Sequence, residues 1–220
     1  MTTREQRIAK FNANRPVYQA VPKAESLART AKDRKLCASL EEAIKRSGLK
    51  DGMTVSFHHA FRAGDFIVNM VMDKIAEMGF KNLTLASSSL IDSHHPIINH
   101  IKNGVVTKIY SSGLRGELAE QISRGLLDEP VNIHSHGGRV HLVKSGELKI
   151  DVAFLGVPCC DKFGNANGFS GKSKCGSLGY ARVDAEYADK VVLLTEEFAD
   201  YPHHPISIGQ DQVDLIVQVD

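Results

Sequence analysis

The sequence has no excess of charge of either sign. Its 220 residues include 27 lysines and arginines against 26 aspartates and glutamates, so the formal net charge is +1. Proteins that bind nucleic acids neutralise the backbone phosphates with a field of basic side chains. The balanced charge therefore predicts that nucleic acid is not a main partner.

Long apolar runs are missing as well. No stretch approaches the roughly 20 apolar residues that a membrane span needs, and the polar residues 1–16 lack the apolar core of a secretion signal. The four cysteines contain no CxxC pair, and Cys159 and Cys160 are adjacent, which is a poor geometry for a disulfide. We therefore predict reduced thiols, a cytoplasmic location and no association with membranes.

Several nucleotide and metal motifs are also absent. Neither GxGxxG nor GxxxxGK followed by Ser or Thr occurs, which argues against a dinucleotide-binding fold and an NTPase. The ten histidines form no HExxH motif, and the pairs at 58–59, 94–95 and 203–204 are adjacent, so their side chains would point to opposite faces of a strand. His134 and His136 share a face without an evident third ligand. The sequence thus predicts no metal site.

The composition is that of a globular protein, with 42% hydrophobic and 24% charged residues. Residues 1–35 are rich in charge and poor in large apolar side chains, which favours an N-terminal arm followed by one domain over residues 36–220. An apolar strand at 213–219 stops one residue before Asp220. We expect on this ground that the chain was cut from a longer protein and that a second half is missing.

From residue 36 onward, helical and strand patterns alternate. Helices are expected at 36–48, 67–78, 96–102, 117–127 and 180–187, and strands at 53–57, 83–86, 105–110, 131–134, 150–157, 191–194 and 213–219. This alternation predicts an α/β fold, a mostly parallel sheet with helices on both faces. Such a sheet binds its ligands at the carboxyl ends of the strands.

The loops after the first two of these strands carry candidate substrate ligands. His58, His59 and Arg62 follow the first strand, and a helix N-terminus beside an arginine favours a carboxylate or a phosphate. A capped turn with solvated histidines is the alternative. Ser87 follows the second strand, where a hydroxyl suits a small anion, although the nearby Ser93 fits equally well as a plain helix N-cap.

The loop after the third strand contains Ser112, Gly113 and Arg115. The glycine allows the backbone to approach a ligand closely, and the arginine supplies a bidentate fork. These three residues are therefore further candidates for substrate binding.

Two later loops complete the candidate set. The loop after the fourth strand contributes His136, Gly137, Gly138 and Arg139. A glycine pair between an imidazole and a guanidinium is costly to order for structure alone, which favours a function. After the long strand at 150–157, Asn165 lies in a turn with Asp161, where bracing of the turn is an equally good interpretation.

Five of these stretches resemble a known family. They read SFHHAFRAGD, SSSLIDSHHPIINHIKNGVV, SSGLRGELAEQISRGLL, IHSHGGR and GVPCCDKFGNANG, and they are similar, in this order, to the alpha chains of citrate lyase. That family belongs to the CoA transferases, so the resemblance implies a CoA-transferase-like α/β fold. It also implies an enzyme that exchanges acetyl for citrate on a thioester.

The same resemblance implies substrates and partners. The substrates would be citrate and an acetyl thioester, carried by CoA or by the CoA-derived phosphopantetheine arm of a carrier protein, with no cofactor bound directly. The partners would be the beta and gamma chains of citrate lyase, in an oligomer. Citrate needs cations and the thioester oxyanion needs donors. The candidates are Arg62, Arg115 and Arg139 for the cations, and His58, Ser87, Ser112 and Gly138 for the donors.

This chain also departs from the CoA transferases at large. They carry a glycine-rich loop after the first strand, where this sequence has FHHAFR, and they place the catalytic glutamate in their second half. No catalytic residue is therefore assigned within residues 1–220, and the chain alone is expected to be inactive. Two alternatives remain at this point, namely a sugar-phosphate isomerase or sensor domain with Asp161 as its base, and a non-catalytic thioester-binding module.

Overall fold

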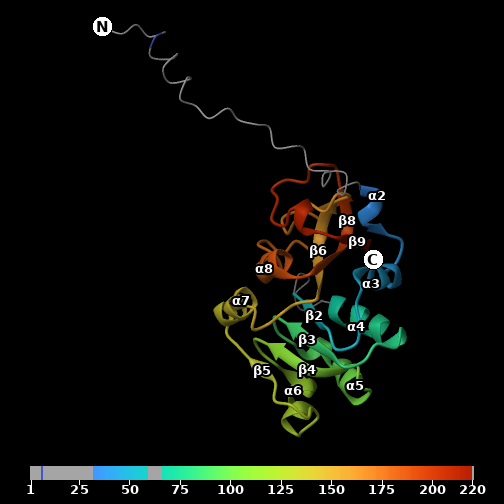
Figure 1. Ribbon diagram of the computed structural model, residues 1–220, viewed down its shortest axis with the longest axis vertical. Coiled ribbons are helices and arrows are strands. Elements are labelled where there is room, and N and C mark those ends of the chain that lie inside the picture. Colours follow the sequence, from blue (N-terminus) through green and yellow to red (C-terminus); the bar gives the residue numbers. More distant parts are fainter. Residues whose placement is uncertain (1–5, 7–31, 59–65, 220) are drawn as a thin grey trace.

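The computed structural model describes residue 6 and residues 32–58 and 66–219. Most of the expected N-terminal arm, together with His59 and Arg62, lies outside the described residues. The described chain folds around one nine-stranded sheet, ordered β1-β9-β8-β6-β2-β3-β4-β5, with β7 paired to β6 (Figure 1).

The strands are short at both ends of the sheet and longest in its middle. Their bounds are β1 Leu36–Cys37, β2 Thr54–Phe57, β3 Leu83–Ser87, β4 Val106–Ser111, β5 Asn132–Ile133, β6 Val152–Asp161, β7 Ala166–Asn167, β8 Lys190–Ala199 and β9 Leu215–Gln218. Neighbours pair in parallel along the whole order, and β7 alone pairs antiparallel, with β6. The expected mostly parallel sheet is thus confirmed.

Helices cover both faces of this sheet. The α-helices are α2 Lys32–Lys35, α3 Leu40–Ser47, α4 Ile67–Glu77, α5 Ile97–Lys102, α6 Gly116–Ser123, α7 His136–Ser145 and α8 Tyr180–Tyr187, and the 3-10 turns are η3 Asp92–His94 and η4 Gln210–Gln212. Helices α3 to α6 share one apolar cluster with the sheet, whereas α7 and α8 share the other. Figure 1 shows α7 and α8 on one side and α3, α4 and α5 on the opposite side.

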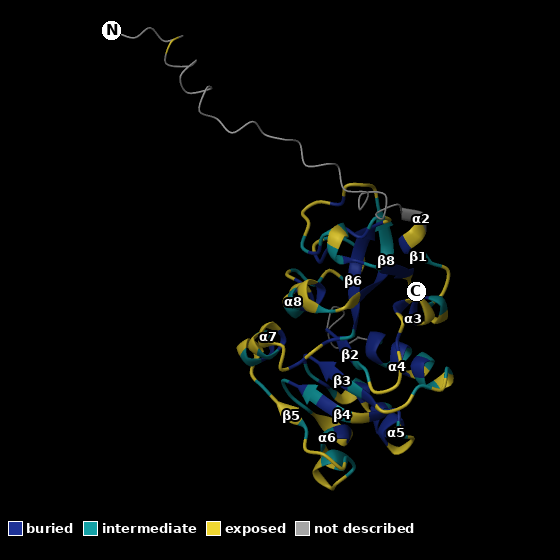
Figure 2. Cartoon of the chain, in the orientation of Figure 1, coloured by how far each residue is buried: buried dark blue, intermediate teal, exposed yellow. Residues whose placement is uncertain are grey.

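The alternation of side chains along the central strands explains why two cores form. In β6, Val152 and Phe154 point into the first cluster, while Ala153 and Leu155 point into the second. Every residue of β6 is buried, as the dark blue centre of Figure 2 shows. A strand buried on both faces reads as a continuous apolar run, which is the pattern that marked it in the sequence.

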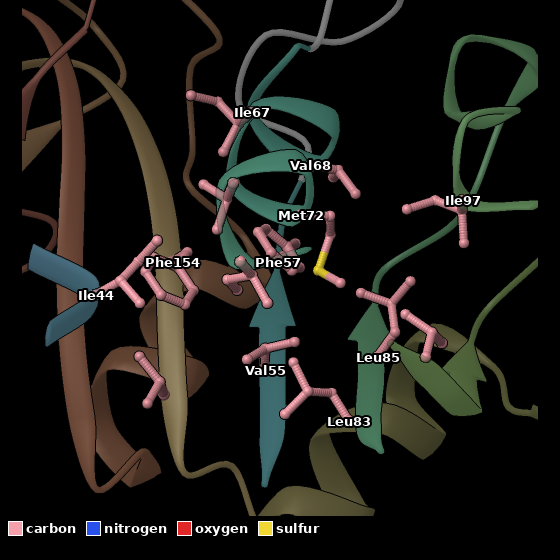
Figure 3. Packing of buried hydrophobic residues seen from close by; sticks show 14 of the residues in the cluster. Ile44, Val55, Phe57, Ile67, Val68, Met72, Leu83, Leu85, Ile97 and Phe154 are labelled. Carbon is pink, nitrogen blue, oxygen red and sulfur yellow. The ribbon is translucent and has the colours of Figure 1, made fainter. Parts of the chain in front are cut away.

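Aromatic stacking locks the middle of the first cluster. Phe57 of β2 pairs in register with Phe154 of β6, and their rings stack with centroids 5.8 Å apart. Ile44 of α3 and Met72 of α4 pack around them (Figure 3). This contact fixes the end of β2, and hence the point at which the chain leaves the sheet toward His58.

Local sequence signals set the ends of the helices. Ser39 caps α3 by accepting a hydrogen bond from the Glu42 amide at 3.1 Å, and Gly48 ends it in the left-handed conformation, with φ 75°. Helix α7 begins and ends in the same way as α3. The Ser135 hydroxyl accepts a hydrogen bond from the Gly138 amide, and Gly146 ends the helix with φ 81°. The sequence prediction missed α7 and treated its first residues as a loop.

Two strands are longer than expected. β6 continues through Pro158, Cys159 and Cys160 to Asp161, a stretch that the sequence prediction assigned to a loop. β8 likewise continues to Ala199 and pairs with β6 as far as Asp161. The proline is tolerated because Val157 and Cys159 on either side of it keep their register with Thr195 and Glu197.

The cysteines are free thiols, as predicted. Burial raises the pKa of Cys160 to about 12, so almost no thiolate forms at neutral pH. We expect iodoacetamide at pH 8 to label the half-buried Cys37 and Cys175 and to leave Cys160 unlabelled in the folded chain. Peptide mass mapping after timed labelling measures this, and labelling of Cys160 as fast as Cys175 would contradict its assignment as a packing residue.

Candidate functional site

The carboxyl ends of β2, β3, β4 and β5 meet at one edge of the sheet, because all four strands run parallel. The loops after β3 and β4 continue side by side beyond the strands. The Ser112 amide donates to the Ser88 carbonyl at 2.9 Å, and the Leu90 amide donates to the Gly113 carbonyl at 2.9 Å. These bonds hold two serine-bearing loops against each other at the sheet edge.

A cavity of about 460 Å³ opens at this edge. Its lining includes His58 after β2, Ser112 after β4 and His136 at the start of α7, so the fold brings together three residues predicted from sequence. The lining is completed by Ser88, Ser89, Val140, Gly179, Tyr180 and Val183. A concave, largely apolar site with a few polar groups is the usual form of a small-molecule site.

Polar atoms without partners point to a ligand in this cavity. Within the described part of the chain, the buried Ser88 hydroxyl has no hydrogen-bond partner, and neither has the Tyr180 hydroxyl. Leaving a buried polar group unpaired costs about 1–3 kcal/mol. The serine expected from sequence was its neighbour Ser87, which is not in the lining and whose hydroxyl donates to the Ser89 carbonyl at 3.2 Å.

The glycine pair belongs to the first turn of a helix. Gly138 donates its amide to the Ser135 hydroxyl at 3.0 Å, which starts α7, and Gly137 stands next to it in the same turn. The His136 ring then packs against Tyr180 at the start of α8, with ring centroids 5.1 Å apart. The N-terminal ends of α7 and α8 thus both border the cavity, and helix N-termini favour negative charge.

Arg139 differs most from the sequence expectation. It is only 1% exposed, and its guanidinium forms an ion pair with Asp184 of α8 at 2.8 Å and donates to the Ser56 hydroxyl at 2.8 Å. The Ser56 hydroxyl donates in turn to Asp184 at 2.5 Å. The expected open cation of a loop is therefore a buried group that ties α7, α8 and β2 together.

Burial raises the pKa of Asp184, while the neighbouring Arg139 and Ser56 oppose that rise. The Nε and Nη1 atoms of Arg139 have no partner among the described residues. The Tyr180 ring lies 5.9 Å from its guanidinium carbon. The Arg139–Asp184 ion pair therefore lies directly behind the part of the cavity wall that Tyr180 forms.

The remaining candidates lie away from this cavity. Arg115 is exposed at the N-cap of α6 and is not among the lining residues. Asn165 is buried and donates from Nδ2 to Asp161 at 2.7 Å. Phe57, at the end of β2, pairs with Phe154 of β6. Asp161 lies seven residues beyond Phe154 along β6, which places it roughly 20 Å from the level at which β2 ends. The bracing interpretation of Asn165 thus explains its contacts.

Tyr180 and Val183 were missed in the sequence although the helix that carries them was expected. A helix that follows a parallel strand begins at the carboxyl edge of the sheet, so the first turn of α8 was the signal that could have found them. Among the described residues, no group of three or more His, Cys, Asp or Glu side chains could hold a metal ion. No helix within the described ranges is long and apolar enough to cross a membrane.

Comparison with known proteins links this arrangement to one family. The family model for the alpha subunit of citrate lyase matches residues 33–220. The citrate lyase alpha chain of Haemophilus influenzae is 90% identical over 220 residues, which cover 100% of this chain and 44% of that relative. The chain thus spans less than half the length of this relative.

Solved structures agree with the match. The putative alpha subunit of citrate lyase from Streptococcus mutans, in complex with citrate, superposes with a TM-score of 0.84 at 52% identity, covering 94% of this chain and 39% of that one. Glutaconate coenzyme A-transferase from Acidaminococcus fermentans superposes with a TM-score of 0.60 at 13% identity, covering 84% of this chain and 75% of that one. The latter likeness shows the fold alone, which is CoA-transferase-like as expected.

Proposed function

Because the chain belongs to the citrate lyase alpha subunit family, we propose that it forms one wall of the active site of a transferase that exchanges acetyl for citrate on a thioester. The single observation that supports this role is the cavity at the carboxyl edge of the sheet, which contains the buried Ser88 hydroxyl, a group without a hydrogen-bond partner among the described residues. The relative from Streptococcus mutans is a complex with citrate, which fits a carboxylate ligand.

In the exchange, the bond between the acetyl carbon and the thioester sulfur breaks and a bond between a citrate carboxyl carbon and that sulfur forms. One oxygen of the citrate carboxylate leaves on the acetyl group, so that the products are the citryl thioester and acetate. The chain supplies hydroxyl donors from Ser88 and Ser112 and the positive ends of α7 and α8 for the carboxylates and for the oxyanion that develops on the carbonyl. The family resemblance places the catalytic glutamate outside residues 1–220. Arg62 remains a proposed cation for citrate, whereas Arg115 lies outside the cavity lining and Arg139 is buried behind the cavity wall in its ion pair with Asp184.

The substrates and partners follow from the same proposal. The thioester is carried by CoA or by the phosphopantetheine arm of a carrier protein, as a substrate and not as a bound cofactor. The beta and gamma chains of citrate lyase are the proposed protein partners, in an oligomer in the cytoplasm. The sugar-phosphate alternative gains no support, because its expected base, Asp161, is fully buried and accepts five N–H hydrogen bonds.

The Ser88 hydroxyl provides the test. In the complete enzyme that contains this chain, we expect Ser88→Ala to raise the citrate KM by about 10- to 100-fold, since a hydrogen bond to a charged group contributes about 1.5–3 kcal/mol. The KM of the acetyl thioester is expected to change far less. Steady-state kinetics with each substrate varied separately measures both constants.

A matched control is Ser123→Ala, which removes an exposed hydroxyl at the end of α6. It should leave both constants unchanged. If Ser88→Ala behaves like this control, or raises both KM values equally, the cavity is not the citrate site.

A further inference from the structure

The cavity at the carboxyl edge of the sheet has two walls of different character. The loops that follow the strands form one wall, which carries the hydroxyls of Ser88, Ser89 and Ser112. Helices α7 and α8 form the other wall, which is apolar at Val140 and Val183. Among the described residues of the lining, Tyr180 supplies the hydroxyl of this helical wall. The exchange described above gives that hydroxyl no role.

The helical wall suits a neutral polar group better than a carboxylate. No lysine or arginine belongs to the cavity lining among the described residues. A carboxylate placed against Val140 and Val183 would lose its water without gaining a cation, whereas an alcohol costs far less to remove from water. Citrate carries a tertiary hydroxyl in addition to its carboxylates. That hydroxyl is therefore the part of citrate that fits the helical wall.

The Tyr180 hydroxyl is able to recognise such an alcohol. Its oxygen is buried and has no hydrogen-bond partner in the described chain. Burial raises the pKa of the Tyr180 phenol above its usual range, although the nearby Arg139 opposes that rise, so the phenol keeps its proton at neutral pH. A protonated phenol can donate one hydrogen bond and accept another, as an alcohol can.

The Tyr180 ring is held from two sides. The His136 ring lies with its centroid 5.1 Å from that of Tyr180, and the guanidinium carbon of Arg139 lies 5.9 Å from the centre of the Tyr180 ring. Arg139 is itself fixed by its ion pair with Asp184, which follows Tyr180 by about one turn of α8. A hydroxyl on a ring that is already fixed loses little conformational entropy on binding, so it discriminates between ligand groups by their position.

We propose that Tyr180 is a specificity-determining residue, whose hydroxyl pairs with the tertiary hydroxyl of citrate and so selects citrate over tricarboxylates that lack this group. The inference rests on the proposed citrate exchange and adds the residue that recognises the neutral group of the substrate. The carboxylates then face the serine hydroxyls of the loop wall. An analogue without the hydroxyl is rejected because it leaves the buried Tyr180 hydroxyl unpaired.

The experiment compares citrate with propane-1,2,3-tricarboxylate, which is citrate without its hydroxyl. Calorimetry on the complete enzyme that contains this chain measures the Kd of each. The parent is expected to bind citrate about tenfold more tightly than the analogue, as one hydrogen bond would provide. In Tyr180→Phe, citrate should weaken by about tenfold. The analogue should bind as in the parent or more tightly, because no unpaired hydroxyl remains.

The matched control is Tyr187→Phe, which makes the same change further along α8, on a side chain that is 41% exposed. It should alter neither Kd. Equal weakening of citrate and of the analogue in Tyr180→Phe would show that the hydroxyl only supports the wall, and would overturn the proposal. A parent that binds both ligands equally well would overturn it too.

The Ser88→Ala variant separates this proposal from the proposed exchange. If Ser88→Ala raises the citrate KM while Tyr180→Phe leaves the ratio of the two Kd values unchanged, the citrate site stands and the role of Tyr180 fails. If neither variant affects citrate, the cavity is not the citrate site and both proposals fail.

Discussion

Replacing Arg139 by methionine is expected to lower the free energy of unfolding by about 3–5 kcal/mol, because it leaves a buried carboxylate without its partner. Asp184 is 0% exposed, and its ion pair with Arg139 joins α7 to α8. Both helices begin at the cavity, so the same change should also disturb the contact between His136 and Tyr180.

The double variant Arg139→Met with Asp184→Leu distinguishes the ion pair from simple packing. Removing both charges leaves no unpaired ion, so most of the lost stability should return. Arg124→Met is the matched control, because Arg124 and Glu120 are exposed on α6 and their charged atoms lie 3.8 Å apart. Exposed pairs of this kind are worth about 0–1 kcal/mol.

Urea unfolding curves for the parent, for the single variants Arg139→Met, Asp184→Leu and Arg124→Met, and for the double variant measure these differences. A loss in Arg139→Met no larger than in Arg124→Met would contradict the buried pair, as would a double variant as unstable as the sum of its singles. The citrate KM of the double variant then shows whether Arg139 also positions the wall of the cavity. If stability returns and the citrate KM stays raised, Arg139 positions the wall of the cavity in addition to holding the fold.

The sheet could be predicted from the sequence because its central strands bury both faces. The apolar run at 150–157 and the glycines that end the helices mark the units, and their alternation requires parallel neighbours. The extension of β6 past Pro158 could not be predicted, because it depends on pairing with β8 some forty residues later in the chain. Local turn signals around Asp161 competed with that long-range pairing.

Helix α7 was missed for a local reason. Gly137 and Gly138 are poor helix formers and disguise its first turn, although Ser135 and Gly146 are a regular N-cap and C-terminal glycine. A search for helix-capping residues before any assessment of helix propensity would have identified α7. Missing α7 also affected the predicted site, because Arg139 was assigned to a loop although it lies in a helix and faces the sheet.

A cavity lies at the sheet edge that the sequence indicated, but only some of the predicted side chains line it. Topology alone brings His58, Ser112 and His136 to one edge, whichever side chains follow the strands. Which of two adjacent serines faces the cavity depends on a single step along the chain, since neighbours in an extended segment point to opposite sides. That step decides between Ser87 and Ser88.

The second large effect is expected at Asp161, far from the cavity. Its Oδ1 accepts hydrogen bonds from the amides of Phe163, Gly164 and Asn165 at 2.9, 3.0 and 3.1 Å, and its Oδ2 accepts from Asn165 Nδ2 at 2.7 Å and the His203 amide at 3.1 Å. Asp161→Asn turns one accepting oxygen into a donor that faces other donors. We expect it to cost about 3 kcal/mol or more in unfolding free energy.

The stability that Asp161 contributes is expected to fall as the pH falls. Burial alone would raise the pKa of Asp161, but the hydrogen bonds from Asn165, His203 and Phe163 outweigh burial, so its pKa falls below the usual 3.8. The folded chain therefore binds fewer protons here than the unfolded chain. The stability from Asp161 is fully present above the unfolded pKa and is lost as pH falls through the lower folded value.

Urea unfolding of the parent and of Asp161→Asn across pH 2.5 to 7 tests both statements. Asp128→Asn, which changes an exposed carboxylate between α6 and β5, serves as the control. The gap between parent and Asp161→Asn should be widest near neutral pH and should narrow below about pH 4, as the parent carboxylate becomes protonated. Asp128→Asn should follow the parent within about 0.5 kcal/mol throughout. A gap that stays constant down to pH 2.5, or one that widens in acid, would show that the charge on Asp161 does not hold the turn beyond β6.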